Sequence, residues 1–141
     1  MSPEENKAIV RRIFEASNTG NPDILDEVIA DDIIIHNPKP GQLPGSEGAK
    51  QSFHKFHSGF PDVQVTIEHL IAEEDLVVMH LLIRATHKGE FAGISPTGKQ
   101  IKITGMEIVR LANGKVVERW SNFDQLGFYR QLGITELQDV V

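Results

Sequence analysis

The chain has 141 residues, 40% of them hydrophobic and 24% charged, values that are ordinary for one soluble globular domain with its own core. Its formal net charge of −6 argues against nucleic acid and anionic membrane surfaces as partners, because both attract basic patches. The absence of cysteine excludes disulfides and thiolate metal sites, and no apolar run approaches the ~20 residues that cross a bilayer. The N-terminus lacks the basic and apolar regions of a signal peptide. We therefore expect a single cytoplasmic domain over residues 1–141.

The first 60 residues predict helices with one short strand between them. Ser2 and Pro3 are typical of a helix start, as cap and first-turn residue, and Gly20 is typical of the end of that helix. Proline and glycine then mark a loop that is placed like a flap over a pocket. The remaining segments are expected as helices over 23–30 and 46–58, a strand over 33–36 and the flap over 39–45.

The second half of the chain predicts an antiparallel sheet. β-Branched and aromatic residues dominate four runs, and short turn-forming links separate them. These strands are expected over 63–72, 75–87, 100–111 and 115–124, followed by a helix over 125–132 and a tail over 134–141. Three helices followed by a long sheet indicate an α+β fold, in which a strongly curved antiparallel sheet wraps around the helices as a cone. The mouth of such a cone is a natural site for a small molecule.

The main candidate site lies in residues 113–133. Asn113-Gly114 suits a tight hairpin turn, and the strand after it alternates its faces. One side therefore carries Glu118, Trp120, Asn122 and Asp124. If that side lines the cavity, Asp124 is an acid/base group beside the aromatic ring of Trp120. If that side faces water, these residues form a polar strand edge. Asp124 also precedes a helix, where aspartate commonly caps backbone N–H groups, so both roles remain open.

Histidines are the other candidate acid/base groups. His36, at a strand end, suits proton transfer or hydrogen-bond donation, or simply bonds to the following turn. His80 and His87 lie on opposite faces of one strand, so only one of them is expected to face the cavity. His54 and His57 are three residues apart on a helix, but no third ligand with the spacing of a metal site accompanies them. No metal is expected.

Aromatic side chains are candidates for contact with a flat hydrophobic ligand. Phe53, Phe56 and Phe60 are close in sequence and suit either a pocket lining or the core. Trp120 suits a pocket wall or a dimer interface. Residues 76–83 are hydrophobic on both faces of their strand, which predicts a homodimer through the sheet. The sequence contains no Gly-rich phosphate loop and no Gly-x-Ser-x-Gly elbow.

Motifs spread over nearly the whole chain point to one family. They are His36-Asn37-Pro38, residues 86–91, 93–99 and 113–120, Asp124 and Gln131-Leu132-Gly133. Together they resemble the SnoaL-like polyketide cyclase, or ester cyclase, family, which belongs to the NTF2-like superfamily of cone-shaped α+β folds. The resemblance implies ring closure by intramolecular aldol condensation on a small ketone-bearing hydrophobic substrate, with no cofactor and no metal.

The resemblance also assigns roles to individual positions. Asp124 matches the acid/base aspartate of the family, and His36 and His87 are the further catalytic candidates. The pocket-lining positions match Phe14, Trp120 and Asn122, to which Phe53 and Phe56 add a possible aromatic lining.

Two other functions fit the same sequence. One is a ligand-binding or dimerisation module without catalysis, and the other is a hydratase or hydrolase in which Asp124 and His36 activate water. Geometry separates them. An enclosed cavity with Asp124 pointing inward, and His36 or His87 within about 6 Å, favours the cyclase. An aspartate turned to its own helix beside a filled cone favours the module.

Overall fold

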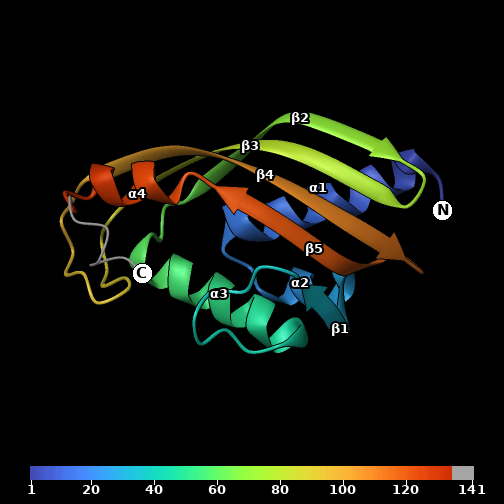
Figure 1. The fold of residues 1–141 in the computed structure, drawn as a ribbon, viewed down its shortest axis with the longest axis horizontal. Coiled ribbons are helices and arrows are strands. Elements are labelled where there is room, and N and C mark those ends of the chain that lie inside the picture. The colour runs from blue at the N-terminus through green and yellow to red at the C-terminus, as the bar shows by residue number, and fades with distance from the viewer. Residues whose placement is uncertain (135–141) are drawn as a thin grey trace.

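The computed structural model describes residues 1–134, which form four helices and one five-stranded sheet (Figure 1). The helices are α1 (Pro3–Thr19), α2 (Asp23–Val28), α3 (Gly45–Gly59) and α4 (Gln125–Gln131). The strands are β1 (Ile29–Ile35), β2 (Gln64–Glu73), β3 (Leu76–Thr86), β4 (Gln100–Ala112) and β5 (Lys115–Phe123). The expected α+β class is confirmed. Of the tail expected over 134–141, all but the first residue lies outside the described residues.

Local chemistry explains both ends of α1. The Ser2 hydroxyl accepts the Glu5 N–H at 3.1 Å while the Glu5 carboxylate accepts the Ser2 N–H at 3.1 Å, which is a capping box. Gly20 ends the helix in the left-handed region with φ +71°. Both boundaries lie where the sequence predicts them. None of the helices within residues 1–134 combines the length and the apolar character needed to span a bilayer.

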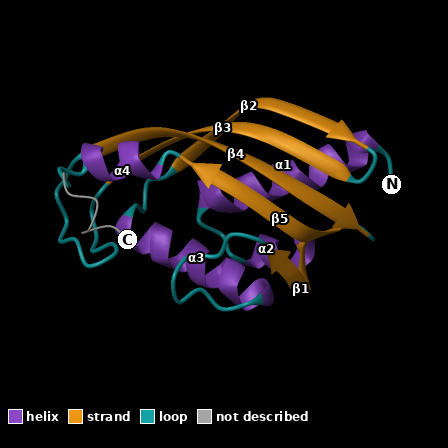
Figure 2. Cartoon of the chain, viewed as in Figure 1, coloured by secondary structure: helices purple, strands orange, loops and turns teal. Residues whose placement is uncertain are grey.

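The sheet has the strand order β1-β5-β4-β3-β2. Strands β2 to β5 form the expected antiparallel meander, in which each strand pairs with the next. The short strand β1 lies beside β5 (Figure 2) and pairs with it in parallel. The expectation of a wholly antiparallel sheet is therefore wrong at this edge. The reason is topological: the chain leaves β1 through α3 and returns to its side only with β5, after the whole meander.

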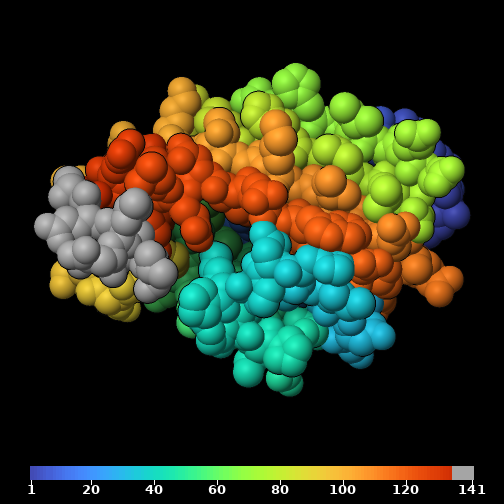
Figure 3. Space-filling view, viewed as in Figure 1, coloured from blue at the N-terminus to red at the C-terminus, as the bar shows by residue number. Residues whose placement is uncertain are grey.

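Within residues 1–134, the helices cover one face of the sheet. We call this side the inner face; it carries the odd-numbered residues of β3 and β4, and all of those positions from Val77 to Leu111 are buried. The opposite side, the outer face, carries the even-numbered residues of the same strands and is the side turned toward the viewer in Figure 3. Side chains of β3, β4 and β5 form much of the surface in that view.

The interior consists of two hydrophobic clusters that meet at Val65 and Phe123. The larger lies between α1, α2 and the sheet, and the smaller surrounds Phe60 and Phe128 near α4. Phe123 packs against both clusters. Its ring occupies the space over Gly105, where an added Cβ would lie 2.1 Å from a ring carbon. The glycine therefore makes room for this ring.

Candidate functional site

Strand register decides which face of the sheet each candidate of β5 occupies. Trp120 pairs with Ile108 and Asn122 pairs with Met106, both exposed residues of the outer face. Residues directly opposite one another on antiparallel strands share a face. Trp120 and Asn122 therefore lie on the outer face, and the interpretation in which this side of β5 lines the cone is corrected. Their substrate-binding role stays a prediction.

His36 lies on the same outer face, stacked on Trp120. The two ring centroids are 4.5 Å apart and the planes differ by 3°. The Nε2 atom of His36 lies 2.7 Å from a carboxylate oxygen of Glu118, and Arg110 donates to the other oxygen at 3.0 Å. Arg110 also binds Asp75 at 2.8 Å. His36 is thus part of a surface network, and its catalytic role stays a prediction.

This network makes the stability of the protein depend on pH. Hydrogen bonds from His36, and then from Arg110, hold the pKa of the Glu118 carboxyl below its ordinary value of 4.5, although desolvation raises it. A lowered folded-state pKa stabilises the protein fully above the unfolded-state pKa, and the stabilisation is lost as the pH falls through the folded-state value.

We therefore expect Glu118→Gln to lower the urea midpoint of unfolding at neutral pH, with the difference from the parent protein shrinking toward zero below pH 4.5. Urea titrations at a series of pH values measure this. Glu68→Gln is the matched control, since Glu68 makes no ion pair among the residues that the structure describes. A difference that grows with acid would contradict the network as described.

Asp124 lies at the N-terminus of α4, and its side chain caps that helix. One carboxylate oxygen accepts the N–H of Gly127 at 2.9 Å, and the residue is exposed. A Cβ at position 127 would lie 2.1 Å from the other oxygen, so glycine is needed for this close approach. The geometry is the one expected of a cap, with the carboxylate turned to its own helix. The acid/base role of Asp124 stays a prediction.

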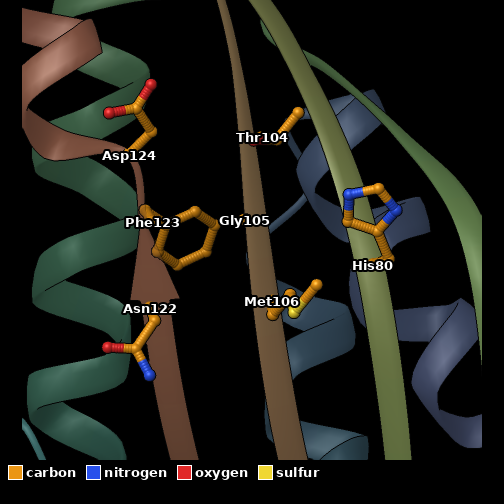
Figure 4. Close-up of a pocket in the computed structure, with 7 residues that line it drawn as sticks. All are labelled: His80, Thr104, Gly105, Met106, Asn122, Phe123 and Asp124. Carbon is orange, nitrogen blue, oxygen red and sulfur yellow. The ribbon is translucent and has the colours of Figure 1, made fainter.

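An open hollow of about 220 Å³ adjoins Asp124 (Figure 4). It is lined by His80, Thr104, Gly105, Met106, Asn122, Phe123 and Asp124. These residues come from β3, β4 and the end of β5. The hollow therefore lies against the sheet, and it brings Asn122 and Asp124 together without any of the predicted phenylalanines.

The other candidates lie on the side of the helices. Phe14 and Phe53 are half-buried against the larger cluster, and Phe56 packs against the smaller one. His87 is fully buried and stacks on Phe60 with centroids 5.2 Å apart. The predicted site is thus divided between the two faces of the sheet. The inner set is Phe14, Phe53, Phe56 and His87, and the outer set is His36, Trp120, Asn122 and Asp124.

The environment of His87 defines its hydrogen bonding. The Thr97 N–H donates to Nδ1 of His87 at 3.2 Å, and the Thr97 hydroxyl lies 3.0 Å from the same atom. Since Nδ1 accepts, the neutral ring carries its proton on Nε2. That nitrogen is buried and has no partner among residues 1–134. Of the two histidines of this segment, His87 lies on the inner side and His80 on the outer face.

His57 connects two helices, which bears on the alternative of a metal site. Its Nδ1 lies 2.8 Å from the carbonyl oxygen of Phe53, and its Nε2 lies 2.8 Å from that of Ser17. Each ring nitrogen thus faces an acceptor, so neither directs a lone pair toward a shared ion with His54. The ring also stacks on Phe53 at 4.0 Å. His57 therefore holds α3 against α1.

Sequence reasoning did not single out a charged pair on the inner face. Glu107 is 5% exposed, and its carboxylate accepts a bond of 2.5 Å from Nη2 of Arg119. Arg119 also donates from Nε to the Ser121 hydroxyl at 3.0 Å. The alternation of β4 could have revealed this pair, because Glu107 is the one charged residue among the odd-numbered, inward-facing positions of that strand.

Lys39, in the flap loop, is electrostatically linked to this pair. The residue is exposed, yet desolvation is the largest cause that lowers the pKa of its ammonium group. Repulsion from Arg119 and Lys55 lowers the pKa further, while Glu107 raises it. Lys39 therefore interacts electrostatically with Arg119 and Glu107 from the flap loop.

Comparisons with known proteins cover almost the whole chain. The profile of the SnoaL-like polyketide cyclase family matches residues 7–132. The aklanonic acid methyl ester cyclase DauD of Streptomyces sp. (strain C5) is 31% identical over 140 residues, which cover 94% of this chain and 83% of that protein.

Solved structures agree with this assignment. IdmH of Streptomyces antibioticus has a TM-score of 0.80 at 31% identity, covering 92% of this chain and 99% of its own. TsrD of Streptomyces laurentii has a TM-score of 0.87 at 24% identity, covering 94% and 98%, and supports the fold alone. On the profile match and these identities, the chain belongs to the SnoaL-like polyketide cyclase family.

Proposed function

We propose that this protein catalyses the closure of a ring in a small, ketone-bearing hydrophobic molecule by an intramolecular aldol reaction, without a cofactor or a metal. The observation that carries the proposal is the 31% identity to an aklanonic acid methyl ester cyclase over nearly the full chain. The proposed compartment is the cytoplasm, as expected from the sequence.

The chemistry requires a base near a carbon acid and a donor near the oxygen on which charge develops. Phe14, Phe53 and Phe56 offer half-buried aromatic surface on the inner face, whereas the hollow beside Asp124 lies on the outer face. The family resemblance, and not the cap geometry, supports Asp124 as the base, so the reacting carbon is proposed to lie in that hollow beside Asn122. The cap of Asp124 uses one oxygen, and the other accepts no hydrogen bond from the described residues.

The test is an assay on aklanonic acid methyl ester and related keto esters in buffer that contains a chelator. Ring closure is an isomerisation, so the expected product has an unchanged mass and a different chromatographic retention. In D₂O, the carbon that loses its proton is expected to take up deuterium before closure. DauD serves as the positive control. Neither isomer nor deuterium uptake, under conditions in which DauD turns over, would overturn the proposal in favour of a non-catalytic module.

We further propose that a second copy of this chain covers the outer face. Exposed hydrophobic side chains gather there, with Val78 at 38%, Met106 at 59% and Ile108 at 38% exposure. The charges at the two ends of the face are complementary. The cationic residues Arg84 and Lys102 lie opposite each other on β3 and β4 at one end. The anionic residue Glu73 lies at the other end. A two-fold axis perpendicular to the strands would bring opposite charges together.

Ile108→Asp is expected to convert the dimer to a monomer, because it places a charge in the apolar centre of the proposed interface. Sedimentation velocity at several protein concentrations measures the change. Leu126→Asp is the matched control, since Leu126 is similarly exposed at 42% but belongs to α4. A parent protein that sediments as a monomer at all concentrations would refute the dimer.

A further inference from the structure

The ion pair between Glu107 and Arg119 lies on the inner face and has no role in the functions described so far. Both residues point toward the helices, since Glu107 pairs with Ser121 and Val109 pairs with Arg119 across β4 and β5. The Glu107 side chain is 6% exposed, whereas that of Arg119 is 31% exposed. The carboxylate is therefore the buried partner, and the guanidinium is the one that a ligand can reach.

Glu107 and Ser121 fix the orientation of this guanidinium. Nη2 of Arg119 donates to Glu107 at 2.5 Å, and Nε donates to the Ser121 hydroxyl at 3.0 Å. A guanidinium has five N–H donors in a planar fork. Three of them therefore make no hydrogen bond to the described residues. A held guanidinium with free donors is suited to an oxygen atom that carries negative charge.

The charge around this group is unbalanced. Lys39 interacts electrostatically with the pair, since repulsion from Arg119 lowers the pKa of its ammonium group and attraction to Glu107 raises it. Arg119, Lys39 and Glu107 together thus carry a formal charge of +1, in a protein whose formal net charge is −6. A bound anion would relieve the repulsion among the cations.

We propose that Arg119 binds the anionic oxygen of an enolised or phenolic ligand on the inner face, with Glu107 and Ser121 as its positioning residues. This inference goes beyond the proposed function, because the site lies across the sheet from Asp124. The site takes a ligand that is already an enolate or a phenolate, and Arg119 keeps its own proton throughout.

The inference is tested with 1,2-dihydroxyanthraquinone, a flat dye whose visible spectrum changes when its phenol ionises. Bound to the parent protein, the dye is expected to ionise at a pH about one unit below that of the free dye, which corresponds to a tenfold preference for the anion. The double variant Glu107→Gln/Arg119→Met removes the cation and its carboxylate together. It is expected to bind the dye and to lose the shift. Arg119→Lys keeps the positive charge without the planar guanidinium, and it is expected to retain part of the shift.

Arg84→Met is the matched control, because it removes an arginine from the outer face of the same sheet. It is expected to leave the shift unchanged. If the parent protein binds the dye without any shift, or if the double variant keeps the full shift, the inference is overturned and the proposed cyclase function stands. If the parent protein does not bind the dye, the inference is overturned, and the proposed cyclase function is decided separately by the keto-ester assay.

Discussion

Asp124→Asn is expected to reduce turnover by about 10²–10⁴-fold, the usual contribution of a general acid or base. The same change is expected to leave the melting temperature within about 1 °C, because asparagine caps a helix as well as aspartate does. The structure makes this pair of results informative. Asp124 accepts the Gly127 N–H at 2.9 Å, so a substitution that removed the cap would confuse stability with catalysis.

Asp124→Ala supplies the matched comparison. It removes the cap as well as the acid, and the loss of a cap costs about 1 kcal/mol. For a chain of this size we expect a fall of about 2–4 °C in the melting temperature, measured by calorimetry. An Asn variant with full turnover would show that Asp124 only caps α4. Turnover lost equally in both variants, with only the Ala variant destabilised, would assign the two roles to the same carboxylate.

Arg119→Met is expected to be the most destabilising substitution of the charged residues, at about 3–5 kcal/mol, because it leaves the buried Glu107 carboxylate without its partner. Urea unfolding at neutral pH measures this cost. The double variant Glu107→Gln/Arg119→Met is expected to recover most of it, since neither charge then remains.

The comparison of these two variants tests the burial of the carboxylate. A pair exposed to solvent contributes only about 0–1 kcal/mol. If the single variant costs no more than that, Glu107 is not the buried group that the structure describes. If the double variant is as unstable as the single one, the loss comes from packing of the Arg119 side chain and not from the orphaned charge.

Most element boundaries could be predicted from the sequence because their causes are local. Ser2 and Gly20 bound α1 through a capping box and a left-handed terminus. Asn113 and Gly114 form the turn between β4 and β5, both with positive φ. The alternation of β5 also grouped Trp120 and Asn122 correctly, because it follows from backbone geometry alone.

The side of the sheet that the helices cover could not be predicted in the same way. Both faces of β3 are apolar, with Val77 and Met79 inward and Val78 and Leu82 outward, so hydrophobicity does not distinguish them. On β5 the hydrophobicity of the side chains predicts the wrong face, since Trp120 lies outward and Arg119 lies inward. The division of the candidate site between two faces is a tertiary property. The parallel pairing of β1 is another, because its partner lies some 80 residues further along the chain.

The contact between Gly105 and Phe123 has a consequence for how this interior can change. One aromatic ring packs against both apolar regions, and it fits only because the facing position lacks a side chain. Side-chain volume can therefore be exchanged between these two positions. We expect a larger residue at 105 with a smaller one at 123 to change the contact between the two regions while every strand keeps its register.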